Sequence, residues 1–301
     1  MKTKKVKILL IMLSFQLCNE LARAQSISIP ELLVNATTRI ECYGDTTING
    51  QRLQFTSVGT GFFFAFTFEK DTITCIVTNF HVIKNSKKGI LRFTEGGNSP
   101  NYGHIVTKNI DSFSTLWIKH PTQDLAIMPI SKIEKEMIQS GKSPFIVYFN
   151  ESNLPNQSLL DDLTAIEDVL MIGYPVGFWD KINNLPVVRK GLTATPTYLN
   201  YDGKPEFLLD IPIYPGSSGS PIILYNQGSY SSRKGGLTVG SRLSLLGINV
   251  ESVNTPITGE VNVSNAHVTT TTNIPINIAI VIKSSELLAF KPMLRNFIYK
   301  K

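Results

Sequence analysis

Short runs of apolar and β-branched residues, separated by turn residues, recur along most of the chain. In the first half, the turn-forming pair Asn49-Gly50 and the Gly-Gly-Asn triplet at 96–98 accompany strand candidates at residues 39–42, 61–68 and 73–78. In the second half, Asp202-Gly203 predicts a hairpin turn, and the strand candidates are residues 168–173, 187–195, 206–211, 221–225, 243–250 and 277–282. Strands this short and this closely spaced predict an all-β barrel or sandwich.

A different pattern occupies residues 131–167. The charge spacing of residues 131–138 predicts a helix with Ser131 as its cap and Gly141 as its stop. Asn, Ser and Pro dominate from residue 150 to residue 158. We therefore expect this region to connect two β units.

Three other stretches carry weaker patterns. Residues 226–242 and 254–275 are rich in Gly, Ser, Thr and Asn, so we expect surface loops there. The tail Ser284–Phe290 is helix-like, and Pro292 follows closely as a stop signal. The alternating phenylalanines at 62, 64 and 66 share one strand face, which predicts packing in a barrel core.

The first 24 residues have the layout of a secretory signal peptide. Lysines at positions 2, 4, 5 and 7 precede the apolar run Ile8–Leu13, and Ala22-Arg23-Ala24 offers small residues for cleavage. The apolar run is shorter than the roughly 20 residues that a membrane span requires. The alternatives are an uncleaved anchor and a lipoprotein acylated at Cys18, although Leu17 is larger than lipoprotein processing normally accepts. We expect a soluble protein, secreted or periplasmic, that begins near Gln25.

Composition excludes two broad classes of protein. The 301 residues are 42% hydrophobic and 17% charged, which is typical of globular chains and not of disordered ones. The formal net charge of +6 falls to +2 without the leader, because the leader holds five basic residues and one acidic residue. The mature chain therefore lacks the basic surface that nucleic-acid binding requires, and we expect a monomer that acts on protein or peptide.

Cysteines and histidines give no sign of a metal site. Without Cys18 the mature chain keeps Cys42 and Cys75, which could be two buried thiols or, if their Cα atoms lie within about 7 Å, a disulfide. The histidines at 81, 104, 120 and 267 are scattered, with no HExxH or CxxC spacing. We expect neither a metal nor an organic cofactor.

Three segments together indicate nucleophilic catalysis. His81 directly follows an apolar strand candidate, Asp124 opens another in Asp124-Leu125-Ala126, and Pro215-Gly216-Ser217-Ser218-Gly219-Ser220-Pro221 is a glycine-flanked serine turn. A serine hydroxyl needs an imidazole to take its proton, and the imidazole needs a carboxylate to hold its tautomer. The developing oxyanion needs fixed donors, which the backbone N–H groups of Gly216 and Ser218 can supply on one tight turn.

These motifs resemble those of the trypsin-like serine peptidases, whose fold is the chymotrypsin double β-barrel. The resemblance covers roughly residues 35–290 and is closest to bacterial exported, stand-alone members, with Thr78-Asn79-Phe80-His81-Val82 at the histidine. It implies that His81 is the general base, Asp124 the orienting acid and Ser218 the nucleophile of a serine endopeptidase. It also implies that Ile213, Tyr214, Val250, Glu251 and Ser252 contact the substrate.

The chain departs from secreted animal relatives at the activation site. Ser217 precedes the nucleophile where those enzymes have an aspartate, and no Ile-Val-Gly-Gly start is present, so we expect signal removal alone to give the active form. No acidic residue lies in residues 210–214 where a preference for Arg or Lys would need one, nor a histidine near Asn249 as in glutamate-specific relatives. We expect Ile213 and Val250 to form an apolar pocket wall, which would favour substrates with small or medium apolar side chains.

The resemblance implies two six-stranded antiparallel β-barrels with a short C-terminal helix. The expected order is a signal peptide (1–24), an N-terminal barrel (25–130), a connection (131–167) and a C-terminal barrel with the helix (168–301).

Two competing functions remain open. An α/β-hydrolase would carry its histidine last, but here only His267 follows the serine turn, and a strand follows that turn instead of a helix. The stronger alternative is a catalytically silent binding module with a peptidase fold.

Overall fold

Strands account for most of the ordered chain in the computed structural model, which describes residues 27–48, 50–69, 71–263 and 266–299. The chain divides into two compact units, residues 1–32 and 33–301. The predicted signal peptide lies outside the described residues, and helix α2 (Ile29–Val34) is the first described element. Everything that follows concerns the second unit.

The first sheet contains eight strands in a barrel-like arrangement. Seven of them follow the order β5-β4-β1-β2-β3-β7-β6, and the short β8 pairs with β2 in parallel. This sheet has two strands more than the six expected, and the 131–167 region contributes one of its strands, β8. Its strands are β1 (Thr37–Ile48), β2 (Gln51–Thr67), β3 (Thr72–Thr78), β4 (Ser86–Gly96), β5 (Pro100–Asp111), β6 (Ile118–Lys119), β7 (Ala126–Pro129) and β8 (Phe149–Asn150).

Strand β2 shows why the apolar runs form a sheet core. Phe62, Phe64 and Phe66 alternate along one face and are fully buried in one cluster of core side chains. Phe63, on the opposite face, is buried in a second cluster with Phe93 and Ile76. The predicted packing role of the phenylalanines is confirmed, and the continuous apolar run reflects a strand that is covered on both sides.

The second sheet is the expected closed six-stranded antiparallel barrel. Its order is β10-β11-β16-β15-β12-β9, which closes on itself and leaves no free edge. The barrel strands are β9 (Asp168–Gly173), β10 (Val187–Thr193), β11 (Glu206–Asp210), β12 (Pro221–Asn226), β15 (Arg242–Val263) and β16 (Ala266–Lys283). A separate hairpin pairs β13 (Ser229–Ser231) with β14 (Leu237–Val239).

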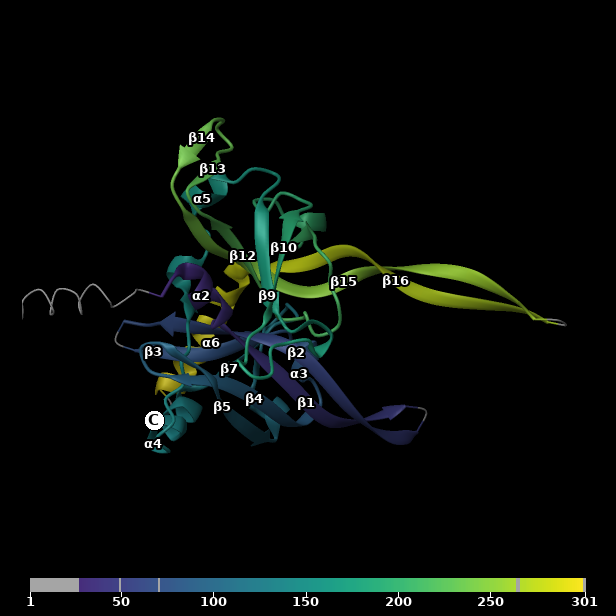
Figure 1. Ribbon diagram of the computed structural model, residues 1–301, viewed down its shortest axis with the longest axis horizontal. Coiled ribbons are helices and arrows are strands. Elements are labelled where there is room, and N and C mark those ends of the chain that lie inside the picture. Colours follow the sequence, from purple (N-terminus) through teal and green to yellow (C-terminus); the bar gives the residue numbers. More distant parts are fainter. Residues whose placement is uncertain (1–26, 49, 70, 264–265, 300–301) are drawn as a thin grey trace, which may run out of the picture. The chain divides into compact units, whose positions relative to one another are not determined.

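The expectation of loops at 254–275 is wrong. Asn254 to Val263 pairs in register with Ala266 to Pro275, so that β15 and β16 continue beyond the barrel as a long two-stranded ribbon (Figure 1). The expected loop at 226–242 likewise contains β13 and β14. The stretch 254–275 is polar but rich in threonine, which has a high β propensity, and residues on a two-stranded ribbon need no buried face.

The helical segments are short and lie between or after the strands. The α-helices after α2 are α3 (Phe80–Ile83), α4 (Ser131–Gln139), α5 (Gln157–Asp162) and α6 (Lys291–Tyr299). The 3-10 helices are η1 (Phe113–Leu116), η2 (Glu151–Asn153), η3 (Pro175–Gly177), η4 (Tyr201–Gly203) and η5 (Ser284–Phe290). In the part of the chain that the structure describes, no helix is long and apolar enough to cross a membrane.

Two details of the predicted helices are wrong: the N-cap of the first helix and the role of Pro292 near the C-terminus. The helix predicted at 131–138 forms as α4, but Ile130 takes the cap position and no side chain caps it. At the C-terminus the helix-like segment 284–290 forms as predicted, as the 3-10 helix η5, but Pro292 does not stop the helical backbone: α6 begins at Lys291 and contains Pro292 in its first turn. Proline fits there because first-turn N–H groups have no partner within the helix.

Cys42 and Cys75 are free, buried thiols in different core clusters. Cys75 packs with Phe62 and Phe64, and Cys42 packs on the other face of the sheet with Ile40. Burial raises the pKa of Cys42 to about 11, which keeps this thiol protonated and unreactive. Of the two possibilities left open by the sequence, the structure contains the buried thiols.

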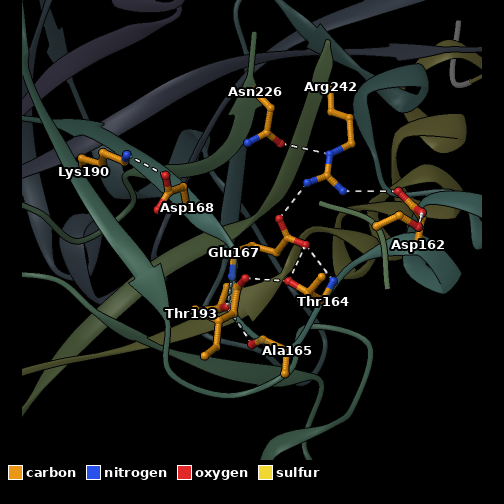
Figure 2. Close-up of polar contacts among 11 residues, drawn as sticks. Asp162, Thr164, Ala165, Glu167, Asp168, Lys190, Thr193, Asn226 and Arg242 are labelled. Carbon is orange, nitrogen blue, oxygen red and sulfur yellow. Dashed lines mark hydrogen bonds and ion pairs between the residues drawn. The ribbon is translucent and has the colours of Figure 1, made fainter. Parts of the chain in front are cut away.

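A buried arginine ties α5 and the β13–β14 hairpin to the second barrel (Figure 2). The Arg242 guanidinium donates to Glu167 Oε2 at 2.7 Å and lies 3.4 Å from Asp162 Oδ2. It also lies over the Tyr230 ring, 3.9 Å from the ring centre. Glu167 also accepts from the backbone N–H of Thr164 at 2.7 Å. The buried charges are therefore paired and hydrogen-bonded, as burial requires.

Candidate active site

Strand pairing in the first sheet brings His81 and Asp124 together. The β-branched run Thr72–Thr78 forms β3, and its last residue, Thr78, pairs with Ala126, the first residue of β7. His81 follows β3 within the single turn of α3, and Asp124 lies two residues before the start of β7. Because the two strands are antiparallel, the end of one and the start of the other lie at the same edge of the sheet.

The two side chains are joined through both the imidazole and the backbone. His81 Nδ1 lies 2.5 Å from Asp124 Oδ2, and the backbone N–H of His81 donates to Asp124 Oδ1 at 3.0 Å. Asn79 donates from Nδ2 to the Asp124 carbonyl at 2.9 Å, which holds the aspartate loop against α3. When Nδ1–H donates to the carboxylate, Nε2 of the neutral imidazole carries the lone pair and can accept a proton.

The carboxylate of Asp124 remains ionised at neutral pH. Burial by itself would raise its pKa, but the hydrogen bonds from the His81 side chain and backbone outweigh burial and lower the pKa below the usual value. The imidazole of His81 is itself half exposed, with 47% of its side-chain surface accessible. A half-exposed imidazole that is oriented by a partly buried anion is suited to exchange protons with a bound molecule.

The serine turn between β11 and β12 docks on the same end of the first sheet. The backbone N–H of Thr60 donates to the Ser218 carbonyl at 2.9 Å, and Thr78 Oγ1 donates to the Thr60 carbonyl at 2.7 Å. Thr78 is the end of β3, three residues before His81. Thr60 and Thr78 therefore join the turn that carries Ser218 to the strand end that leads to His81.

Two glycines make this close approach possible. A Cβ on Gly219 would lie 2.0 Å from the Thr60 carbonyl oxygen and 2.4 Å from Thr78 Oγ1. A Cβ on Gly216, whose φ is +94°, would lie 2.4 Å from the Tyr174 carbonyl oxygen. Any side chain at either position would push the turn away from its neighbours.

The turn leaves two backbone N–H groups without a protein acceptor. Ser217, Gly219 and Ser220 donate from their N–H groups to the carbonyls of Tyr214, Asn249 and Ser217, respectively. Within the described parts of the chain, the N–H groups of Gly216 and Ser218 donate to no protein atom. They are the two groups that the sequence predicted as donors to an oxyanion.

The residues predicted to contact substrate occupy three different environments. Val250 and Glu251 line a cavity of about 500 Å³ that Asp124 also lines. Ser252 follows on β15 and is half-buried, whereas Ile213 is buried in the core of the second barrel. Tyr214 is exposed, and the Arg189 guanidinium lies 4.8 Å from its ring centre. The structure therefore brings Val250 and Glu251, but not Ile213, to a surface beside Asp124.

The other histidines are not part of the site formed by His81, Asp124 and the serine turn. His120 is buried, accepts at Nδ1 from the backbone N–H groups of Thr122 and Gln123, and approaches the Glu286 carbonyl with Nε2 at 3.2 Å. His104 is exposed on β5, and the side chain of His267 lies outside the described residues. In the described ranges, no group of three or more His, Cys, Asp or Glu side chains could hold a metal ion.

Sequence reasoning missed three supports of the turn. Thr60 and Asn249 are fully buried and bond the turn with their side chains, and the segment Tyr174–Val176 contacts it with backbone atoms. A polar Thr60 between Gly59 and Gly61, just before an aromatic strand, was a usable signal. Asn249, a lone amide in an apolar strand, was another, because a buried amide needs a partner.

Comparison with known proteins agrees with this geometry. Residues 59–230, more than half of the chain, match the family model described as "Trypsin-like peptidase domain". The matched range includes His81, Asp124 and Ser218. No curated protein matches the chain.

Proposed function

This chain belongs to the family of trypsin-like peptidase domains, and from that premise we propose that it is an exported serine endopeptidase. The observation that carries the proposal is the pairing of His81 with Asp124 through two hydrogen bonds, at the sheet edge on which the Ser218 turn docks. The substrate is a protein or peptide. The enzyme works as a monomer and needs no cofactor.

In the proposed reaction Ser218 Oγ attacks the carbonyl carbon of the scissile peptide bond. His81 Nε2 takes the hydroxyl proton, and Asp124 stabilises the resulting imidazolium. His81 then gives that proton to the leaving amine as the C–N bond breaks, which leaves an acyl-enzyme. A water molecule, deprotonated by His81, attacks the ester and releases the acid together with free Ser218.

The oxyanion of each tetrahedral intermediate is bound by the N–H groups of Gly216 and Ser218. The support for this role is that both groups lack an acceptor among the described residues, whereas the N–H groups of Ser217, Gly219 and Ser220 in the same turn are hydrogen-bonded. Preorganised donors of this kind contribute about 10²–10³-fold each to kcat. Val250 and Glu251, beside Asp124, receive the substrate chain.

Export is the second part of the proposal and depends on the leader. Lysines followed by an apolar run and the Ala22-Arg23-Ala24 segment support removal of residues 1–24 and delivery to the periplasm or the medium. Expression of the full-length chain tests this part: N-terminal sequencing of the exported protein should place its first residue near Gln25.

A fluorophosphonate probe, read by intact-mass spectrometry, tests the catalytic assignment. We expect one adduct on the mature protein and none on the Ser218→Ala variant, together with hydrolysis of a casein substrate by the first protein only. Ser220→Ala is the matched control, since Ser220 lies in the same turn, and it should still be labelled. Absence of an adduct on a correctly folded wild type would contradict the enzyme and favour a silent binding module.

A further inference from the structure

The backbone of the serine turn is held by contacts on four consecutive peptide groups. The carbonyl of Pro215 accepts from the Val176 N–H at 2.5 Å, and the carbonyl of Gly216 accepts from Thr60 Oγ1 at 2.8 Å. The carbonyl of Ser217 accepts from Asn249 Nδ2 at 2.9 Å, and that of Ser218 accepts from the Thr60 N–H at 2.9 Å. Each of the four carbonyls therefore has a donor that fixes its direction.

The direction of a carbonyl determines the direction of the N–H in the same peptide group. In a trans peptide the C=O and N–H bonds point to opposite sides, and the described residues contain no cis bond. The Gly216 N–H therefore points away from Val176, and the Ser218 N–H points away from the Asn249 amide. Reversing either peptide would remove one of the two free donors and direct a carbonyl oxygen to its place.

Thr60 connects the turn to a second segment that also supports it. Its hydroxyl donates to the Gly216 carbonyl and accepts from the Tyr174 N–H at 3.1 Å. Tyr174 lies two residues before Val176, whose N–H holds the Pro215 carbonyl. One buried hydroxyl of the first sheet thus fixes both the turn and the loop that orients the Gly216 N–H.

Asn249 supports the turn from the second barrel. Its backbone N–H donates to Ser220 and its carbonyl accepts from Gly219, both at 2.9 Å, so the side chain starts from a fixed position. Asn249 Oδ1 has no partner among the described residues, and Nδ2 donates to the Ser217 carbonyl. The hydrogen bonding of this buried amide is thus directed at the turn.

We propose that Thr60 and Asn249 are positioning residues that hold the 215–218 turn with its two free N–H groups presented together, without any cleavage-generated N-terminus. This inference rests on the proposed function, because presenting two donors matters only if an oxyanion forms there. Both side chains are completely buried, at 0% exposure, so water cannot replace the hydrogen bonds that they make. The turn is therefore assembled by folding alone.

The Thr60→Val variant tests this role, because valine keeps the shape of threonine and lacks its hydroxyl. We expect kcat for a peptide ester to fall at least tenfold while KM stays within about twofold, since the hydroxyl acts on the oxyanion donors and not on ground-state binding. Thr60→Ser should restore kcat. Thr38→Val is the matched control: Thr38 is equally buried, and its hydroxyl donates to the Arg92 carbonyl instead of the turn.

The Asn249→Leu variant provides a second, independent test of the proposal. It removes the amide and keeps the approximate volume, and the expected result is again a fall in kcat at nearly constant KM. A kcat within twofold of wild type in both Thr60→Val and Asn249→Leu would overturn the proposal. So would a loss that Thr38→Val reproduces, because it would then reflect the loss of any buried hydroxyl.

Crystal structures of the variants separate this proposal from the proposed function. If the wild type neither reacts with a fluorophosphonate nor hydrolyses peptides, the proposed function is wrong. The positioning role is then decided by the peptide orientations alone: it is supported if the Pro215–Gly216 or the Ser217–Ser218 peptide turns over in a variant, because these two peptides carry the Gly216 and Ser218 N–H groups. It is overturned if both peptides keep their wild-type directions.

Discussion

At the scale of single residues, the carboxylate of Asp124 determines which nitrogen of His81 carries the proton. It accepts from the His81 side chain with one oxygen and from the His81 backbone with the other. An aspartate that only accepts leaves Nδ1–H as the sole compatible tautomer, so that Nε2 is free to act as a base. An asparagine would fill the same space but could donate to Nδ1 and stabilise the opposite tautomer.

We therefore expect Asp124→Asn to lower kcat by about 10⁴-fold with little loss of folding stability. Steady-state hydrolysis of a peptide ester and the rate of fluorophosphonate labelling both measure this loss. Asp111→Asn, which changes an exposed aspartate on β5, is the control and should behave as wild type. Near-normal turnover in Asp124→Asn would show that Asp124 does not hold the base.

Glu134 on α4 provides a pH-dependent prediction. Burial raises the pKa of this carboxyl, although it accepts a hydrogen bond from Thr74 Oγ1 at 2.7 Å and another from Tyr148. A carboxyl whose pKa is raised by folding stabilises the fold below its unfolded pKa, and this contribution is lost as pH rises through the folded value. At neutral pH the ionised Glu134 is therefore a destabilising group.

Glu134→Gln should accordingly raise the melting temperature at pH 7, and the difference from wild type should vanish below about pH 4, where the glutamic acid is protonated. Thermal unfolding at a series of pH values measures the effect. Glu136→Gln, on the same helix but exposed, should show no such trend. A lower melting temperature for Glu134→Gln at pH 7 would mean that the hydrogen bonds to the carboxylate outweigh its burial.

The sequence predicted residues that act through their own chemistry and missed those that act through the backbone. His81 and Asp124 could be identified because a base and its orienting acid must be of particular types, and the structure pairs them. Thr60 and Asn249 contribute one hydrogen bond each to a carbonyl, which many residue types can do. Local patterns mark both residues as unusual, but their importance depends on where strand pairing places them, and the sequence does not show that placement.

At the scale of elements, buried apolar runs were predicted accurately and the exposed strands were not. Strand β9 has the bounds that the pattern indicated, Asp168–Gly173, because its side chains must be buried in the barrel. The described side chains of residues 254–275 are exposed, so hydrophobic alternation could not reveal this ribbon. Its pairing is between neighbouring segments in sequence, and threonine content was the remaining local signal.

The Arg242–Glu167 pair is the polar contact whose loss should affect the second barrel most (Figure 2). Arg242 is 8% exposed and Glu167 is 5% exposed, so Arg242→Leu would leave a carboxylate buried without its partner. Breaking a buried pair in this way costs about 3–5 kcal/mol of unfolding free energy. Urea unfolding measures the loss.

Lys190→Ala serves as the control for that measurement. Lys190 pairs with Asp168 at 2.6 Å in the same region, but both side chains are exposed, and such pairs contribute at most about 1 kcal/mol. The double variant Arg242→Leu, Glu167→Leu should recover part of the loss, because it removes the unpaired charge. If Arg242→Leu and Lys190→Ala had the same free energy of unfolding, the buried pair would not stabilise the second barrel more than an exposed pair does.

At the scale of the second unit as a whole, the candidate site is shared by the two sheets. The first sheet carries His81 and Asp124 at the ends of β3 and β7, and the turn before β12 of the barrel carries Ser218. The order of the motifs along the chain made this division predictable. The number of strands in the first sheet was not predictable in the same way. One of its strands, β8, joins it from the connecting region through a two-residue parallel pairing.

The long ribbon formed by β15 and β16 extends beyond the strand pairing that closes the barrel. Strand β16 pairs with β11 only from Ile278 to Ile282, and β15 pairs with β12 only from Arg242 to Ile248. Residues 255–274 therefore lie beyond both contacts. The described side chains of this stretch, such as Ile257 and Ile274, are exposed. Replacing residues 255–274 by Asn-Gly should therefore leave the barrel closed, since this pair favours a tight hairpin turn.

For this shortened chain we expect a melting temperature within a few degrees of wild type and an unchanged rate of fluorophosphonate labelling. The physical reason is that Asn249 and Glu251, a proposed substrate-binding residue, precede the deleted segment and keep their pairing with β16. Loss of labelling with a normal melting temperature would contradict this, and would show that the ribbon supports the 215–218 turn across the barrel. Normal turnover of a small ester, combined with weaker cleavage of a folded protein, would instead assign the ribbon to the capture of large substrates.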